Sequence, residues 1–332
     1  MRKVRFILPF LATLLPAALR VKGQAVDTSE HISMAYVDSV MSNDTLMRDL
    51  NAFIDSAQSP KTLLAIEFGA GNGFFISRNA TAATGYATQS FFSPSVTYLH
   101  KSGLGISGAA YAAPSQGKWT VYQGVITPSY GLARKDWAAG VSYSRYINKD
   151  STSFGLTPLR NDAYIYGIFK KFWLEPGAAF DFSFDSYKLE TTVLKTVYPP
   201  KTEVIDNNIH AHTMSTIATV QHDFEWFGLF SKNDHIAFTP TLSILADASN
   251  YNISTIGHLK AGDEQRWEQN FEKTTGKDKG FSLESASALL DAVYSYGHFL
   301  VDPQLLGTYF INASPGVASF RISYLVNVGL VF

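Results

Sequence analysis

The chain has 332 residues and a formal net charge of −1, because 27 Lys and Arg nearly balance 28 Asp and Glu. This balance excludes the strongly basic surface typical of nucleic-acid binding, so no nucleic-acid partner is expected. The absence of cysteine excludes disulfides, thiol catalysis and zinc sites with cysteine ligands. Aromatic residues reach 14% and charged residues only 17%, so many rings must lie in a core or a membrane.

Residues 1–25 are predicted to be a signal peptide. The stretch MRKVRFILPFLATLLPAALRVKGQA begins with basic residues, continues with an apolar run and ends at a small-residue site near Gly23 and Ala25. The run is shorter than the roughly 20 residues of a transmembrane helix, and Pro9 and Pro16 interrupt it. The sequence therefore predicts export rather than a helical anchor.

Residues 26–60 are predicted to be a periplasmic segment that contains one short amphipathic helix. Capping residues at 42–44 precede apolar residues at helical spacing, and Pro60 ends the pattern. The apolar positions are Leu46, Met47, Leu50, Phe53, Ile54 and Ala57. Two placements are open: the helix packs at the mouth of a barrel, or it enters the lumen as a plug.

From residue 61 onward the hydrophobic pattern has a period of two. In TLLAIEFGAG, every second residue from Leu64 to Ala70 is apolar, and the opposite face carries Glu67. The same alternation recurs down the chain, with one apolar face and one small, polar face. Strands are expected to begin near residues 62, 88, 103, 119, 136, 161, 173, 209, 235, 281, 299 and 317.

The connections between these strands alternate between two kinds. Short turns are expected at 100–103, 133–136, 170–173, 231–234 and 296–299, and loops, most of them longer, at 76–87, 113–118, 148–160, 190–208, 253–279 and 313–316. This alternation is typical of a membrane barrel with periplasmic turns and external loops. The fold class is therefore predicted as all-β, a transmembrane antiparallel up-and-down barrel of about twelve strands over residues 61–332.

Two of the loops are unusually large. Residues 190–206 keep alternating on both sides of Pro199 and Pro200, which indicates a hairpin that extends beyond the membrane. Residues 262–279 are rich in charge and indicate a solvated surface. If the protein acts at the cell surface, these loops are the expected places for recognition.

The last strand, SFRISYLVNVGLVF, has the most regular alternation of the chain and ends on an aromatic residue. Tyr324, Val328, Leu330 and Phe332 share its apolar face. This pattern resembles the C-terminal signature of Gram-negative outer-membrane β-barrel proteins, and the long aromatic strands look like barrels of the Bacteroidota type. The resemblance implies that the last strand closes against the first, near residues 62–75. It also implies an outer-membrane location, with membrane lipid, the barrel-assembly machinery and periplasmic chaperones as partners.

Tryptophans mark the expected membrane interfaces. Trp137 and Trp173 follow predicted periplasmic turns, Trp226 precedes another, and Trp119 falls at the opposite interface. An interfacial girdle of aromatic residues has this distribution.

Charged residues within the predicted strands must face the lumen. A lipid-facing Arg or Lys at the bilayer midplane costs about 2–4 kcal/mol, whereas a lumen-facing charge keeps water. The expected lumen-lining residues are Glu67, Asp181, Asp185, Asp247, Asp291 and Arg321, with Glu67 and Asp291 toward the periplasm. They are consistent with a channel for small solutes or, equally, with an internal network that braces the wall. A closed barrel that acts through its external loops is the alternative function, and an outer-membrane hydrolase is the third.

The sequence offers little support for catalysis or for a cofactor. His222 and Asp223 are neighbours on a strand and point to opposite faces, so they cannot form a dyad. His210 and His212 share a face and, with Glu203 or Asp206, could hold a metal, but that face looks lipid-directed. No phosphate loop, dinucleotide fingerprint or Cys/His metal spacing is present. We therefore expect no enzyme activity, no cofactor and no metal.

Overall fold

A computed structural model describes residues 62–77, 86–115, 117–148, 154–155, 159–195, 201–256, 278–311 and 319–332. The predicted signal peptide and the predicted helix of residues 44–57 lie outside these residues. Among the described residues, no helix is long and apolar enough to cross a bilayer. Nearly all of the described chain is β-strand.

The strands are β1 (Leu63–Ser77), β2 (Tyr86–Leu99), β3 (Leu104–Ser115), β4 (Lys118–Ala133), β5 (Trp137–Asn148), β6 (Phe154–Gly155), β7 (Asn161–Phe169), β8 (Glu175–Lys195), β9 (Lys201–Gln221), β10 (Phe224–Phe227), β11 (Asp234–Ile256), β12 (Asp278–Tyr296), β13 (Phe299–Phe310) and β14 (Phe320–Val331). Twelve of them form the wall, each antiparallel to the next. The short β6 pairs with the end of β1, and β10 pairs with the start of β11.

The wall is closed on itself. Strand β14 pairs with β1 from Ala65 opposite Val331 to Asn72 opposite Tyr324. Beyond this ladder, Leu64 and Phe332 exchange backbone hydrogen bonds of 3.0 and 2.9 Å. On the far side, β9 pairs with β11 and completes the circle. The predicted all-β barrel of about twelve strands, closed by its last strand against its first, is confirmed.

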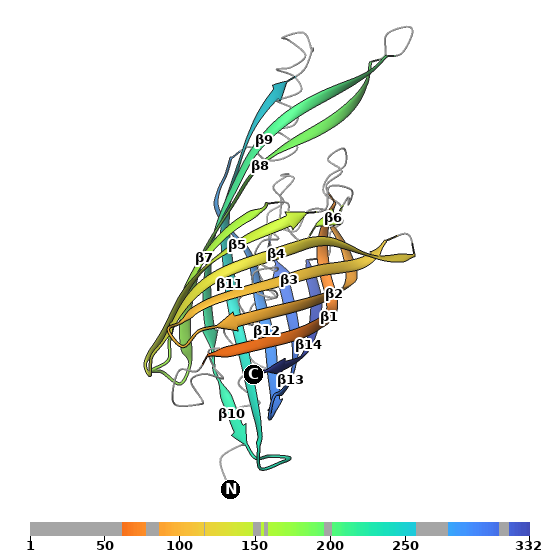
Figure 1. Cartoon of the computed structure of the whole chain (residues 1–332). Coiled ribbons are helices and arrows are strands. Elements are labelled where there is room, and N and C mark those ends of the chain that lie inside the picture. The colour runs from red at the N-terminus through yellow and green to blue at the C-terminus, as the bar shows by residue number, and fades with distance from the viewer. Residues whose placement is uncertain are drawn as a thin grey trace.

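Most strands begin within two or three residues of the predicted positions, and the differences have physical reasons. Strand β9 begins at Lys201 rather than near residue 209, because the β8–β9 ladder continues to Lys195 opposite Lys201. Strand β7 pairs with β8 only as far as Phe184. The described hairpin β8–β9 therefore extends past its neighbour, and Figure 1 shows it projecting from one end of the barrel. The two short strands, β6 and β10, were not expected.

The connections define two ends of the barrel. Strand pairs β2–β3, β4–β5, β7–β8, β10–β11 and β12–β13 join through turns at one end, which we call the turn end. Strand β1 begins and β14 finishes at this same end; the other is the loop end. Gly103 shows why some turns need glycine: its φ is 91°, and a Cβ there would lie 2.0 Å from the carbonyl oxygen of Gly131.

Side chains on the outer face of the wall are mostly apolar and exposed. On β1, Ile66 and Phe68 are 48% and 58% exposed, whereas the alternate residues Ala65 and Glu67 are buried. Phe180, Leu242 and Ile322 are likewise exposed on the outer faces of other strands, next to buried residues of the inner face. A continuous apolar exterior of this size is stable only against lipid, so the barrel is of the transmembrane kind.

Two β-bulges each add one residue to the inner face. Tyr122 has no partner in the β3–β4 register, and both Tyr122 and Gln123 are consequently buried. Glu284 is likewise skipped in the β11–β12 register, and both Glu284 and Ser285 are buried. These positions break the alternation that the sequence analysis used.

Candidate functional site in the barrel lumen

A continuous apolar ring runs around the inside of the wall. We call it the apolar belt, and each of its members is at most 8% exposed. Every wall strand except β1 contributes to it, and β1 places Gly71 beside the belt residue Leu325. The belt consists of Phe91, Tyr111, Ala113, Tyr122, Val125, Tyr146, Tyr164, Ala179, Ile217, Leu245, Leu289, Leu306 and Leu325.

The belt has two chemically different halves. From β2 to β7 it is mainly aromatic, and the rings of Phe91, Tyr111 and Tyr122 follow one another with centroids 6.1 and 6.4 Å apart. From β8 to β14 it is entirely aliphatic and runs from Ala179 to Leu325. The aromatic half therefore presents tyrosyl hydroxyls as well as rings, whereas the aliphatic half presents no polar atom.

On the turn-end side of the belt lies a group that we call the lower acidic cluster. It consists of Glu67, Asp291, Asp302, Gln304 and Asn327, on four adjacent strands. Gln304 Nε2 donates a hydrogen bond of 2.8 Å to Asp302 Oδ2, and Asn327 Nδ2 donates one of 3.0 Å to the same oxygen. Its three carboxyl groups are at most 6% exposed. The cluster thus gathers three carboxyl groups and two amides at one level of the inner wall.

A second group of carboxyl residues lies on the loop-end side of the belt. Asp162 and Asp181 are 5% and 3% exposed and lie on the adjacent strands β7 and β8, with Asp162 opposite Ser183. Ser183 Oγ donates a hydrogen bond of 3.1 Å to Asp181 Oδ1. Asp247 is fully buried and belongs to the same row, because it lies opposite Ser215, which lies opposite Asp181. The belt is thus bordered by carboxyl groups on both sides.

Asp185 lies further toward the loop end and is neutralised by a local partner. The Nε of Arg160 lies 3.0 and 2.8 Å from the two carboxylate oxygens of Asp185. Arg160 Nη2 also donates a hydrogen bond of 2.7 Å to the carbonyl oxygen of Ser186. This ion pair links the start of β7 to the base of the projecting hairpin.

The structure places all six expected lumen residues on the inner face of the wall. Glu67 and Asp291 come together in the lower acidic cluster, and Asp181 and Asp247 share the row above the belt. Arg321 lies over the ring of Phe310, with its guanidinium carbon 5.4 Å from the ring centroid. Whether any of them lines a permeation path remains a proposal.

Three buried acidic residues of the inner face were not singled out from the sequence: Asp162, Glu284 and Asp302. Asp162 shares its face with Tyr164 and Tyr166, and Asp302 shares its face with Leu306 and Phe310. The alternation of β7 and β13 puts both residues on the inner face, but that face also carries large apolar residues, so the sequence did not show which face was the inner one. Glu284 lies at a bulge, where parity itself fails.

The four tryptophans of the expected girdle lie near the ends of the wall and are 38–59% exposed. Trp137 begins β5, Trp226 lies in β10, and Trp119 is the second residue of β4 at the loop end. Trp173 lies in the turn before β8, which begins at Glu175. Their outward, exposed placement is compatible with a membrane interface.

The apolar residues of the C-terminal signature face outward. Tyr324, Val328, Leu330 and Phe332 are 41–55% exposed, and Phe332 lies beside His298 of the β12–β13 turn. Recognition of this strand by an assembly machinery remains an expectation.

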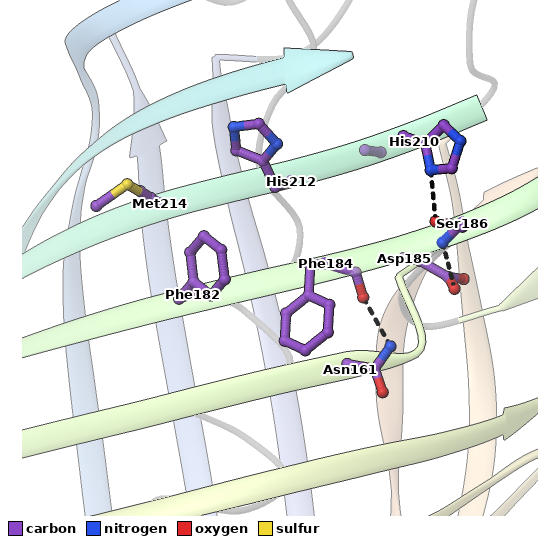
Figure 2. A pocket seen from close by; sticks show the side chains of 9 residues that line it. Asn161, Phe182, Phe184, Asp185, Ser186, His210, His212 and Met214 are labelled. Atoms are coloured by element: carbon purple, nitrogen blue, oxygen red, sulfur yellow. Dashed lines mark hydrogen bonds between the residues drawn. The ribbon is translucent and has the colours of Figure 1, made fainter. Parts of the chain in front are cut away.

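A groove of about 590 Å³ lies on the outer wall near the base of the hairpin (Figure 2). Phe182, Phe184 and Met214 form its apolar side, and His210, His212 and Ser186 add polar groups. His210 Nδ1 and Ser186 Oγ are 2.7 Å apart and share a hydrogen bond. This serine–histidine pair is the feature that comes nearest to the hydrolase interpretation.

Among the side chains that the structure describes, no third group orients this histidine as a hydrolase would require. Asn161, in the same groove, is committed elsewhere, because its Oδ1 accepts from Tyr143 and Arg145 and its Nδ2 donates to the Phe184 carbonyl. The neighbouring Asp185 is held by Arg160. The described geometry therefore shows a hydrogen-bonded cross-strand pair and not a triad.

A metal site at His210 and His212, which the sequence analysis considered, is not supported by the described residues. Within them, no group of three or more His, Asp or Glu side chains could hold a metal ion. The side chains of Glu203 and Asp206 lie outside the described part of the structure.

Comparisons with known proteins find only distant structural similarity. No protein family matches the chain, and no curated protein matches it. Among solved structures, the NanC porin is 11% identical with a TM-score of 0.36, over 80% of this chain and 98% of the porin. The deltaS2 mutant of the TodX monoaromatic hydrocarbon channel is 7% identical with a TM-score of 0.37, over 82% of this chain and 89% of that one.

The translocator domain of the autotransporter NalP from Neisseria meningitidis is also similar. It is 7% identical with a TM-score of 0.33, over 89% of this chain and 97% of the domain. Because all three scores are low, the class of the fold rests on the closed wall and its apolar exterior. On that basis the chain has the architecture of an outer-membrane β-barrel.

Proposed function

We propose that the protein is an outer-membrane channel for small solutes, with a preference for cations, whose path runs through the lumen. The observation that carries this proposal is the layering of the inner wall. Carboxyl groups lie on both sides of the apolar belt, at Glu67, Asp291 and Asp302 below it and at Asp162 and Asp181 above it. Carboxylate groups in the wall of a channel attract cations and repel anions.

The width of the barrel supports a path of this kind. Twelve strands about 4.8 Å apart and tilted by about 40° give a wall about 24 Å across between backbones. An eight-stranded wall of the same spacing is about 16 Å across and is just filled by its own side chains. A twelve-stranded wall therefore leaves a space about 8 Å wide, which is enough for a small hydrated solute.

In this proposal the barrel lies in the outer membrane of a Gram-negative bacterium, with its turn end in the periplasm. The exposed aliphatic and aromatic side chains contact lipid. The C-terminal strand, ending at Phe332, engages the barrel-assembly machinery after export, with periplasmic chaperones as carriers. The projecting hairpin β8–β9 then extends outside the cell.

Planar-bilayer conductance of the refolded mature chain tests the proposal, together with a chain that lacks residues 26–58. We expect discrete conductance steps from at least one of the two chains, with a reversal potential in a salt gradient that favours cations. Silence from both chains, when each is shown to be folded, would overturn the channel function. Folding is checked by the heat-sensitive electrophoretic mobility typical of intact barrels.

A second function is favoured by one specific observation, the extension of hairpin β8–β9 past strand β7. A barrel that serves as a surface-interaction protein would use this hairpin, and nothing would need to cross the lumen. Deletion of residues 189–207 shortens the hairpin without touching the wall that β7 and β8 share. Loss of a surface phenotype with unchanged conductance would support this alternative.

A further inference from the structure

The groove on the outer wall changes in polarity along its length. Three rows of paired residues cross it from β8 to β9, and from the turn end to the loop end they are Phe182 with Met214, Phe184 with His212, and Ser186 with His210. The first row is apolar, the second joins a phenyl ring to a histidine, and the third is polar. Figure 2 shows these side chains along the two strands. A groove of this kind matches an amphiphile whose polar end points toward the loop end.

The apolar end of the groove is a continuous surface that is open to the surroundings of the barrel. Met214 and Phe182 are 50% and 41% exposed. The ring of Phe182 lies 5.5 Å from that of Phe184 and 6.3 Å from that of His212, measured between centroids. A hydrocarbon chain can therefore pack along this surface through van der Waals contacts.

The rows lie at the level where one face of a bilayer ends. Strand β9 finishes at Gln221, opposite Glu175 and close to Trp173 at the turn end. A strand tilted by about 40° rises about 2.6 Å per residue, so Met214 lies about 18 Å and His210 about 29 Å from Gln221 along the barrel axis. The apolar band of a membrane barrel is about 25 Å tall. Its loop-end limit, where lipid head groups begin, therefore falls between Met214 and His210.

A positive charge lies at the edge of the groove. Arg145 Nη1 donates a hydrogen bond to Oδ1 of Asn161, which lines the groove. Tyr143 Oη donates to the same oxygen at 2.7 Å, and Asn161 Nδ2 donates to the carbonyl oxygen of Phe184 at 3.0 Å. Because these partners are uncharged, they position the guanidinium of Arg145 without neutralising it.

This charge is suited to a phosphate group. Among the described residues, Arg145 forms no ion pair, and the groove carboxylate Asp185 is paired with Arg160. A guanidinium binds phosphate through parallel N–H donors. The exposed rings of His210 and His212 add N–H donors on the same side of the groove.

We propose that the groove binds one phosphate-bearing lipid of the leaflet at the loop end. Its phosphate lies on the guanidinium of Arg145, and an acyl chain lies on Phe182 and Met214. A free anion would leave the apolar surface unused, and an uncharged lipid would leave Arg145 without an anion. The site lies outside the wall, so it does not depend on solute passage through the lumen.

Native mass spectrometry of the refolded mature chain tests the site. The probe is dimyristoyl phosphatidic acid, and dimyristoyl glycerol has the same chains without the phosphate. We expect one molecule of the phosphatidic acid to bind, at least about tenfold more tightly than the glycerol lipid. Arg145→Gln is expected to weaken its binding about tenfold, because the charge-assisted hydrogen bonds are lost. Arg134→Gln, which changes an exposed arginine in the β4–β5 turn at the opposite end, is the matched control and should bind normally.

A second pair of variants tests the apolar part of the site. Met214→Gln is expected to weaken binding of the phosphatidic acid, whereas Leu242→Gln, on the outer wall beyond the groove, is not. Unchanged binding by folded Arg145→Gln or by folded Met214→Gln would overturn the proposal. If Arg145→Gln does not fold, Arg145→Lys takes its place, because it keeps the charge and loses the parallel donors; weaker binding is expected, and unchanged binding would overturn the proposal.

Other occupants give different results. Displacement of the lipid by excess inorganic phosphate would indicate a site for a free anion and overturn the proposal. Equal binding of the two lipids, or a dimer of the chain that binds neither, would overturn it as well. Lipid binding is measured without conductance, so its failure and the failure of the channel function are separate results.

Discussion

The ring of His298 stacks on the ring of Phe332, with centroids 5.4 Å apart and 25° between the planes. His298 Nδ1 also lies 2.6 Å from the carbonyl oxygen of Val331. Because a carbonyl oxygen only accepts, this nitrogen carries the proton and donates the hydrogen bond. The β12–β13 turn therefore holds the end of β14 against β1, where Leu64 and Phe332 complete the wall.

Phe332→Ala is expected to weaken closure of the barrel. It removes the aromatic contact with His298 and apolar area at the seam, and we expect the free energy of unfolding to fall by about 1–2 kcal/mol. Urea unfolding of the refolded chain, followed by tryptophan fluorescence, measures this. Phe281→Ala is the matched control, because Phe281 is 56% exposed and Phe332 is 55% exposed. Equal losses for the two variants would show that the His298 contact adds nothing.

Gly71→Ala is expected to disturb the same seam from the other strand. A Cβ at Gly71 would lie 2.3 Å from the carbonyl oxygen of Tyr324, and because this atom is backbone it cannot move aside cheaply. Overpacking of this kind costs about 1–3 kcal/mol. Gly280→Ala is the control, since a Cβ there meets nothing within 4 Å. The same unfolding assay compares the two, and a Gly71 variant as stable as the Gly280 variant would contradict the close approach of β1 and β14.

Neutralising the carboxyl pair above the belt is expected to reduce cation preference. Asp162→Asn and Asp181→Asn are made together, because both buried carboxyl groups lie above the belt on the adjacent strands β7 and β8. The reversal potential of the conducting chain in a potassium chloride gradient should shift toward zero. Asp136→Asn, in an exposed turn, is the control and should leave it unchanged. An unshifted potential in the double variant would remove these residues from the path.

The strands were predictable from the sequence because each outer face meets lipid and is almost uniformly apolar, so the period of two is strong in TLLAIEFGAG and in SFRISYLVNVGLVF. The inner face was predicted less well. On β7 and β13 it carries Tyr164 and Leu306 of the apolar belt, and a face with such residues does not look inward. Asp162 and Asp302 were overlooked for this reason. The bulge at Glu284 depends on pairing between distant strands, which no local pattern contains.

The ion pair between Arg160 and Asp185 is expected to hold the base of hairpin β8–β9. The side chain of Asp185 is 5% exposed, whereas that of Arg160 is 39% exposed. Arg160→Ala leaves a buried carboxylate without the Arg160 Nε that faces both of its oxygens, and we expect it to lower the free energy of unfolding by about 2–3 kcal/mol. Loss of one partner from a fully buried pair costs about 3–5 kcal/mol, and the exposure of Arg160 to solvent reduces this.

A double-mutant cycle separates the pair from its surroundings. Asp185→Asn added to Arg160→Ala removes the unpaired charge, so we expect the double variant to regain about 1 kcal/mol or more relative to Arg160→Ala alone. Urea unfolding measures the unchanged protein, the two single variants and the double variant at one salt concentration, because salt screens the attraction between exposed charges. If the effects of the two changes on the free energy of unfolding are additive, the ion pair does not stabilise the barrel. In that case the base of the hairpin is held by the backbone ladder between β8 and β9 and by the outer contact of Phe182 with Phe184, whose ring centroids are 5.5 Å apart.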